Sequence, residues 1–207
     1  MPQPIQIGQH TIGEGYPTFL IAELSGNHGG DLGKAVELLH ASSDAGANAV
    51  KIQVYRPDTI TLKSDKPDFL IASDNPWAKH KNLYSLYEYA HTPWEWLPNL
   101  FEEANALNIE LFGSVFDETS ITELENYPTK LYKIASPEIV DTDLLTKVAQ
   151  TEKPVIISTG LAEIQDLDLA VRTLETAGCT DIIILKCSTA YPTPANEVNL
   201  KTLRHLE

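Results

Sequence analysis

Lysine side chains interrupt two apolar runs of this sequence. Lys51 lies in the run Ala49–Val54, and Lys133 lies in Leu131–Ile134. Lysine is almost never fully buried unless it is paired, so each of these positions suggests a chemical role. An ammonium group in a dehydrated cleft attracts phosphate or carboxylate strongly, because little water screens its charge there. The alternative is that each side chain only extends from a strand end to water.

Short hydrogen-bond donors and two carboxylates accompany these lysines. The hydroxyl-bearing residues that follow apolar runs are Ser114, Ser136, Ser158 and Thr189. Glu23 and Glu138 also follow such runs, and their carboxylates suit sugar hydroxyls or proton transfer. The set as a whole predicts a site for a small phosphate-bearing metabolite, but it does not name the reaction.

The apolar runs predict the strands of a parallel α/β fold. They are short and nearly continuous in apolar residues, as expected for strands covered on both faces. The predicted strands are Thr18–Ala22, Ala49–Val54, Ile109–Phe112, Leu131–Ile134, Val155–Ile157 and Ile182–Leu185. The predicted helices are Leu32–Ala45, one that starts at a capping box in Thr92–Glu95, Asp143–Gln150 capped by Asp141, Ala162–Ala177 and Leu200–Glu207. Ligands of such folds bind at the carboxyl ends of the strands.

Six βα units are fewer than the eight that close a TIM (β/α)8 barrel of roughly 250 residues. We therefore expect residues 1–207 to form a partial barrel domain in which the last two βα units are absent. Within the second strand, Lys51 and Gln53 are expected to share a face because strand side chains alternate. A long connection, Thr59–His91, follows this strand, and such connections are often functional. A solvated insertion is the alternative.

Composition excludes several classes of function. The chain has 29 acidic and 15 basic residues and a formal charge of −14, which argues against a nucleic-acid partner. It has no apolar run long enough for a membrane span and no secretory signal, so we expect no membrane partner and a cytoplasmic location. Cys179 and Cys187 are expected to be reduced, with Cys187 a buried, unreactive thiol. The six histidines lack metal-binding spacing, and His28 is expected to form hydrogen bonds in a loop.

Several motifs together resemble the sialic-acid synthase family. They lie in Ile21–His28, Gly46–Gln53, Tyr132–Ser136, Ser158–Gly160 and Leu185–Pro192. Enzymes of this family condense phosphoenolpyruvate with an amino-sugar aldehyde to give nine-carbon keto acids. Three features resemble the pseudaminic-acid synthase branch more than the N-acetylneuraminate branch. They lie in Tyr55–Lys66, in Leu83–Trp96 and in Leu185–Cys187, where the N-acetylneuraminate branch often has histidine in place of Lys186.

The resemblance implies roles for individual residues. The implied phosphoenolpyruvate contacts are Lys51, Ser114, Lys133, Ser136, Ser158 and Thr189. The implied sugar contacts are Glu23, Gln53, Asn75 and Tyr191. The implied catalytic residues are Glu23, Lys51, Lys133 and Glu138, of which Glu138 assists water addition or proton transfer. Ser114 and Thr189 differ in type from the threonine and asparagine of some family members.

The resemblance also implies groups outside these residues. A divalent cation, Mn²⁺ or Mg²⁺, is implied, with its histidine ligands expected beyond the end of this chain, so no metal ligand is assigned here. An antifreeze-like C-terminal domain, which is absent here, and a homodimer are implied for the intact enzyme. The expected reaction joins phosphoenolpyruvate to a 6-deoxy diacetamido hexose, forms pseudaminic acid and releases phosphate.

Three other interpretations remain open. The first is N-acetylneuraminate synthase, with the same chemistry on N-acetylmannosamine. The second is an aldolase that uses Lys51 or Lys133 as a Schiff-base nucleophile. The third, from another class, is a non-catalytic module that binds a phosphate-bearing ligand, in which case this chain is inactive alone.

Overall fold

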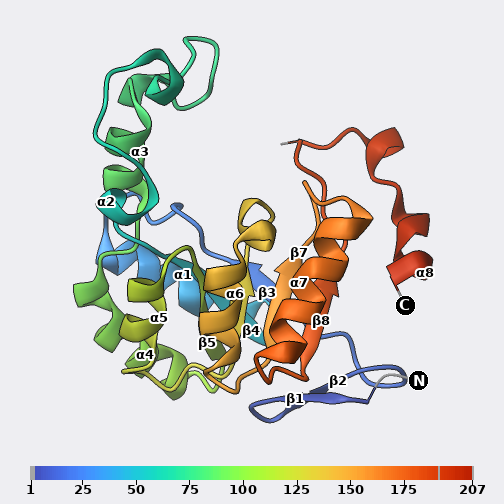
Figure 1. Ribbon diagram of the computed structural model, residues 1–207. Coiled ribbons are helices and arrows are strands. Elements are labelled where there is room, and N and C mark those ends of the chain that lie inside the picture. The colour runs from blue at the N-terminus through green and yellow to red at the C-terminus, as the bar shows by residue number, and fades with distance from the viewer. Residues whose placement is uncertain (1–2, 191, 207) are drawn as a thin grey trace. The chain divides into compact units, whose positions relative to one another are not determined.

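The computed structural model describes residues 3–190 and 192–206. The chain divides into two compact units, Met1–Thr129 and Lys130–Glu207. Parallel strands alternate with helices in both units (Figure 1). The described residues contain six βα units in sequence, so the predicted α/β fold of the TIM (β/α)8-barrel type is confirmed.

Three parallel strands form the sheet of the first unit. β3 pairs with β4, and β4 pairs with β5, in sequential order. The strands and α-helices of this unit are β1 (Ile5–Ile7), β2 (His10–Ile12), β3 (Ile21–Glu23), α1 (Leu32–Asp44), β4 (Ala49–Val54), α2 (Pro57–Ile60), α3 (Leu83–Ala90), α4 (Leu97–Ala106), β5 (Glu110–Val115) and α5 (Glu118–Leu124). Short 3₁₀ helices are η1 (Pro67–Phe69), η2 (Ala78–His80) and η3 (Trp94–Trp96).

Strand β4 coincides with its predicted bounds and alternates as predicted. Ile52 and Val54 are fully buried, whereas Lys51 and Gln53 are half-buried. The two polar residues therefore share the less buried face of the strand, which confirms the prediction. The apolar face packs within the core of the unit.

The hairpin β1–β2 is absent from the sequence predictions, since each strand has only three residues. The strands are antiparallel and are joined by a two-residue turn that begins at Gly8, with φ of 55°. A Cβ atom at Gly8 would lie within 2 Å of the Glu110 carboxylate, which shows how closely the hairpin approaches the start of β5, and the positive φ at this position favours glycine. The hairpin therefore lies at the amino ends of the strands.

The predicted long connection is an ordered insertion. Figure 1 shows it at the top of the first unit, at the end opposite the β1–β2 hairpin. Its helix α3 approaches the loop after β3 closely, since a Cβ at Gly26 would lie 3.2 Å from Ala90. The ring of Tyr55, just after β4, contacts Tyr87 edge-to-face at 5.6 Å. The insertion is therefore attached to the strand ends through its final helix.

The capping box predicted at Thr92 is wrong. Thr92 is fully buried, and its hydroxyl has no hydrogen-bond partner among the described residues. The chain instead forms η3 and then starts α4 at Leu97. Burial of Thr92 took priority over local capping, because tertiary packing routinely overrides local propensity.

The second unit repeats the same pattern. β6 pairs in parallel with β7, and β7 pairs with β8. Its elements are β6 (Tyr132–Ile134), η4 (Pro137–Val140), α6 (Thr142–Ala149), β7 (Val155–Ser158), α7 (Ile164–Thr176), β8 (Ile182–Leu185), η5 (Ala195–Glu197), η6 (Leu200–Thr202) and α8 (Leu203–Leu206). The Asp141 carboxylate accepts from the Leu144 N–H at 3.0 Å, which confirms the predicted cap of α6.

In the part of the chain that the structure describes, none of the helices combines the length and the apolar character that crossing a bilayer requires.

Candidate active site

Glu23, Lys51 and Ser114 meet at the carboxyl ends of β3, β4 and β5. The Lys51 ammonium forms an ion pair with the Glu23 carboxylate. It also donates to Ser114 Oγ at 3.0 Å. In the sheet register, Glu23 lies beside Lys51, and Gln53 lies beside Ser114. Parallel register thus brings together residues that are far apart in the sequence.

The three side chains differ in their exposure to water. The Lys51 side chain is 14% exposed and that of Glu23 is 42% exposed, while Ser114 is buried. The carboxylate therefore faces solvent at the rim and the ammonium lies beneath it. A ligand that enters this cluster meets a cation whose charge is already balanced by a carboxylate.

The loop after β3 holds Glu23 in place. Its Oε1 accepts from the N–H of Ser25 at 3.0 Å, and Ser25 has a left-handed φ of 49°. Further along this loop, the fully buried His28 accepts from the Gly30 N–H at its Nδ1, at 3.1 Å. Burial, with His91 and Lys34 nearby, lowers the pKa of His28. The prediction that His28 is a hydrogen-bonding loop residue is therefore confirmed.

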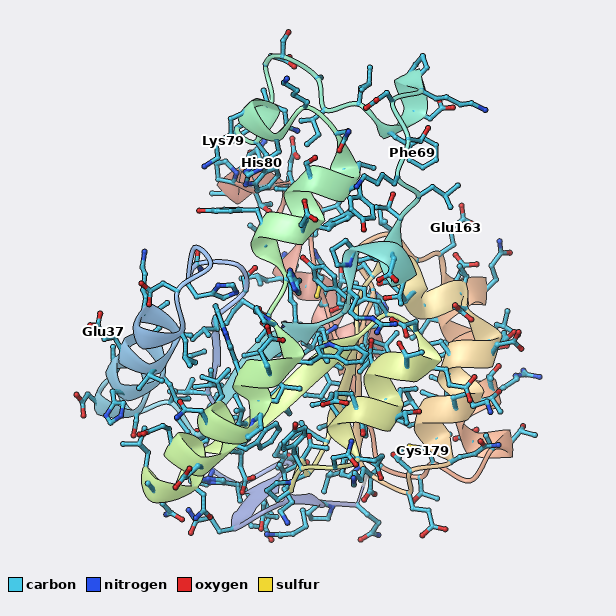
Figure 2. The ribbon with its side chains drawn as sticks, turned by 90° about the vertical axis from the view of Figure 1, so that its left-hand side faces the viewer. Glu37, Phe69, Lys79, His80, Glu163 and Cys179 are labelled. Carbon is cyan, nitrogen blue, oxygen red and sulfur yellow. The ribbon has the colours of Figure 1, made fainter. Side chains whose placement is uncertain are left out.

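Asn75 serves a local structural purpose. Its side-chain oxygen accepts from the Trp77 N–H at 2.9 Å, and its backbone takes part in the same turn. Figure 2 shows the neighbouring Lys79 and His80 on the insertion, beside the upper part of α3. No hydrogen bond or ion pair described for this unit joins Asn75 to Glu23 or Gln53, so its sugar-binding role stays a prediction.

Lys133 and Ser158 form the centre of a second cluster, in the second unit. Lys133 is only 5% exposed and Ser158 is 6% exposed. The Lys133 ammonium donates to Ser158 Oγ at 2.5 Å and to the Ile134 carbonyl. A buried ammonium needs such partners, because an unpaired charge in the protein interior is very costly. The sequence prediction that β6 contributes a buried lysine at a strand end agrees with this geometry.

Ser136, Gly160 and Cys187 adjoin this pair. Ser136 Oγ accepts from the N–H of Gly160 at 3.1 Å. The Cys187 thiol lies 3.2 Å from Ser158 Oγ. A Cβ at Gly160 would lie 2.9 Å from Ser136 Oγ and 3.1 Å from the methyl carbon of Thr189. The loops that follow β6, β7 and β8 therefore meet at Gly160.

Cys187 corrects one sequence prediction. It is half-buried and contacts Ser158, whereas a buried, unreactive thiol was expected. The reason is its position directly after β8, at the edge where the strand ends converge. Neither Gly160 nor Cys187 is among the predicted site residues, although Gly160 follows Ser158 and Thr159 directly in the sequence.

Glu138 lies on η4, just after β6. Burial raises the pKa of its carboxyl group, and the nearby Lys133 charge offsets this only in part. Its Oε2 atom is buried without a hydrogen-bond partner among the described residues. A carboxyl group in such a setting takes up a proton more readily than an exposed one. Proton transfer, the role that the resemblance implies, is chemically consistent with this environment.

Two predicted features find no counterpart in the described structure. Tyr191, predicted to contact the sugar, lies outside the described residues. Within residues 3–190 and 192–206, no three His, Cys, Asp or Glu side chains are grouped so that they could hold a metal ion. These residues therefore do not fit the divalent cation that the resemblance implies, and no catalytic step is derived through it.

The sequence model of the NeuB family matches residues 38–207. The chain belongs to the NeuB family. The predicted resemblance to sialic-acid synthases is thereby confirmed, because pseudaminic acid synthases are among the relatives of this NeuB-family chain. That of Helicobacter pylori is 43% identical over 187 residues, which cover 90% of this chain and 54% of the relative. That of Campylobacter jejuni serotype O:23/36 is 43% identical over 189 residues, covering 91% and 54% respectively.

Solved structures of other proteins share the fold of this NeuB-family chain. The N-acetylneuraminic acid synthetase of Leptospira borgpetersenii superimposes with a TM-score of 0.87 at 29% identity, over 100% of this chain and 66% of that one. The spore coat polysaccharide biosynthesis protein SpsE of Bacillus subtilis gives 0.82 at 34% identity, over 99% and 53%. The chain spans about half the length of the curated relatives it matches.

Proposed function

We propose that this chain carries the phosphoenolpyruvate-binding part of a synthase that forms a nonulosonic acid. The proposed reaction joins phosphoenolpyruvate to a 6-deoxy diacetamido hexose and yields pseudaminic acid and phosphate. The single observation that carries the proposal is that half-buried Lys51 and buried Lys133 each donate a hydrogen bond to a serine at the carboxyl end of a strand. The pseudaminic acid synthases among the relatives support the choice of sugar.

The reaction forms a carbon–carbon bond to the sugar and a bond between C2 and the oxygen of water, and it breaks the bond between C2 and the phosphate oxygen. C3 of phosphoenolpyruvate attacks the aldehyde carbon of the sugar, and positive charge develops at C2. Water adds at C2, and the resulting tetrahedral intermediate releases phosphate. In this proposal, as the resemblance implies, Lys51 and Lys133 each contact phosphoenolpyruvate through its carboxylate or its phosphate. Their fixed charges stabilise the charge redistribution without any reorganisation of solvent.

The proposed secondary contacts follow the two clusters. Ser114, Ser136, Ser158 and Thr189 supply short donors or packing around phosphoenolpyruvate. Glu23 and Gln53, at the rim of the first cluster, orient the sugar hydroxyls, and Asn75 and Tyr191 are further proposed sugar contacts. The raised pKa of Glu138 supports its role in transferring a proton during water addition.

A divalent cation, Mn²⁺ or Mg²⁺, is proposed as a requirement of the reaction on the resemblance alone. If it is required, dialysis against a chelator should abolish turnover, and Mn²⁺ or Mg²⁺ should restore it. Full activity in the chelator would remove the cation from the proposal.

Turnover with named substrates tests the proposed function directly. The protein is incubated with phosphoenolpyruvate and the 6-deoxy diacetamido hexose, with Mn²⁺ present, while released phosphate and the nine-carbon product are quantified. We expect both products in equal amounts. We also expect Lys51→Ala and Lys133→Ala to reduce turnover by at least 100-fold each. Wild-type kinetics in both variants, or phosphate release without the nine-carbon product, would refute the proposal.

N-acetylneuraminate synthesis is a second candidate, favoured by the N-acetylneuraminic acid synthetase among the solved structures. The chemistry is the same and the sugar is N-acetylmannosamine. Comparison of kcat/KM for the two sugars discriminates between the candidates. A higher value for N-acetylmannosamine would favour this second function.

We also propose that the protein acts in the cytoplasm and as a homodimer, as the resemblance implies. Light scattering that reports a monomer at working concentration would contradict the dimer. Recovery of the protein from a membrane fraction would contradict the location.

A further inference from the structure

The hydroxyl oxygen of Ser158 accepts hydrogen bonds from two donors of the protein. A serine oxygen has two lone pairs and one proton. The Lys133 ammonium donates to it at 2.5 Å, and the Cys187 thiol donates to it at 3.2 Å. With both lone pairs engaged, the proton of Ser158 is the group that it can offer to a ligand.

A backbone N–H group also donates to the hydroxyl oxygen of Ser136. Its oxygen accepts from the N–H of Gly160 at 3.1 Å, so its proton points away from that amide. Ser158 therefore offers a ligand its proton, and Ser136 can offer its proton as well. Such a site suits a group that only accepts hydrogen bonds, such as a phosphate or carboxylate, better than a sugar hydroxyl.

The absence of a side chain at Gly160 also shapes this site, in addition to its N–H group. A Cβ there would lie 2.9 Å from Ser136 Oγ, 3.1 Å from the Thr189 methyl carbon and 3.4 Å from the Cys187 Cβ. Gly160 is outside the residues with positive φ, so alanine strains its backbone little. Alanine would instead displace the Ser136 hydroxyl and fill the space between the loops that follow β6, β7 and β8.

We propose that Gly160 and Cys187 are positioning residues that turn the Ser136 and Ser158 hydroxyls into donors for a phosphate group. The inference rests on the proposed function only in taking phosphoenolpyruvate as the natural ligand. It extends that function by adding two residues that act through others.

Calorimetry with inorganic phosphate and with phosphoenolpyruvate tests the role of Gly160. We expect the wild-type protein to bind both, and Gly160→Ala to weaken both at least tenfold while the melting temperature changes little. The matched control is Gly33→Ala, the same chemical change on α1 of the first unit, which should leave both affinities unchanged.

A pair of substitutions tests Cys187 in the same assay. Serine keeps a donor beside Ser158, so Cys187→Ser should retain wild-type affinity. Alanine removes the donor, so Cys187→Ala should weaken phosphate binding about threefold to tenfold. Because a merely structural role depends on volume, equal losses in the two variants would contradict the proposed hydrogen bond.

Alkylation by iodoacetamide locates the ligand without any activity assay. The Cys187 sulfur attacks the methylene carbon, iodide leaves, and the thiol proton passes to solvent. We expect saturating phosphoenolpyruvate to slow this reaction at least fivefold. Cys179 is the internal control, since it is 2% exposed. Figure 2 shows Cys179 near the carboxyl end of α7, whereas Glu163, the N-cap of that helix, lies at the other end.

The outcomes separate the inference from the proposed function. If the wild-type protein binds phosphoenolpyruvate and Gly160→Ala binds it equally well, the inference fails and the proposed function stands. Alkylation of Cys187 at the same rate with and without bound phosphoenolpyruvate would also overturn the inference. If the wild-type protein binds neither phosphate nor phosphoenolpyruvate, the proposed anion site itself is wrong.

Discussion

The two lysine clusters solve the burial of a cation in different ways. In the first unit, Lys51 forms an ion pair with Glu23 and donates to Ser114. In the second unit, Lys133 donates to Ser158 and to the Ile134 carbonyl, which are neutral oxygens. The Glu23 carboxylate pairs directly with Lys51, whereas the carboxyl group near Lys133 is that of Glu138, whose raised pKa makes it a weaker counter-charge.

Two carboxyl groups, one in each unit, show a parallel contrast. Burial raises the pKa of Asp117, but hydrogen bonds from Thr119, Ser120 and Thr59 outweigh it, so the pKa is lowered. Burial also raises the pKa of Glu138, and its buried Oε2 has no partner among the described residues. Donors thus stabilise the Asp117 carboxylate, whereas the surroundings of Glu138 favour protonation.

The largest expected effect separates the two lysines. Lys133→Met should weaken phosphoenolpyruvate binding at least 100-fold, about 2.7 kcal/mol, because a buried charge and its hydrogen bond to Ser158 are lost. Lys51→Met should weaken binding about tenfold, since the Glu23 charge already offsets part of the attraction. Calorimetry on both variants measures the difference. A larger loss of affinity in Lys51→Met than in Lys133→Met would contradict the proposed difference between the two clusters.

Neutralising Glu23 should have the opposite effect on ligand affinity from removing a lysine. Glu23→Gln removes the charge that balances Lys51, so phosphoenolpyruvate should bind about threefold to tenfold more tightly, while turnover of the sugar falls. The matched control is Glu37→Gln, the same charge change on the exposed outer side of α1 (Figure 2). Equal gains in the two variants would mean that net charge alone sets the affinity for phosphoenolpyruvate.

Asp117 should contribute to stability through its capping of α5. Its carboxylate accepts from the Thr119 and Ser120 N–H groups at 2.7 and 3.2 Å. Asp117→Ala should therefore cost about 1 kcal/mol, or about 2–4 °C in melting temperature. Asp117→Asn keeps an acceptor and should cost less.

The pH dependence of that loss follows from the lowered pKa of Asp117. A group with a lowered pKa stabilises the fold above its unfolded pKa of about 3.9, and this contribution disappears as pH falls through the folded value. The difference between wild type and Asp117→Ala in thermal melts should therefore shrink below about pH 4. A constant difference from pH 7 to pH 3 would contradict the assignment.

The smallest expected effect is a gain in stability at Glu138. A raised pKa means that stability from the protonated form is present below the unfolded pKa of about 4.3 and is lost as pH rises through the folded value. Glu138→Gln is neutral throughout, so it should raise the melting temperature by about 1–2 °C at pH 7 and by nothing near pH 4. Destabilisation at pH 7 would show that the carboxylate has a partner in solution.

Local sequence patterns predicted much of the scaffold. The apolar run Ala49–Val54 matches β4, and Asp141 caps α6 as predicted. Both features depend on neighbours within a few residues, such as the alternation of strand side chains and a cap two or three residues from its donor. The predicted burial of lysines at strand ends has the same basis, because the runs around Lys51 and Lys133 are apolar.

Features that depend on distant residues escaped prediction. Thr92 has the local pattern of a cap but is buried instead, and Cys187 approaches Ser158 across β7 and β8. The β1–β2 hairpin requires Gly8 to approach Glu110, about a hundred residues away in the sequence. None of these contacts leaves a periodic signal in the chain.

Short-range patterns in the sequence were enough to predict the order of the βα units and which polar residues follow the strands, because periodicity and side-chain chemistry act over a few residues. Only the tertiary structure decided which of these residues meet. Strand register places Glu23 beside Lys51, and the Lys51 ammonium then reaches Ser114. The convergence of three loops places the bare Cα of Gly160 against Ser136. Register and loop packing depend on the whole buried core, so short-range patterns do not specify them.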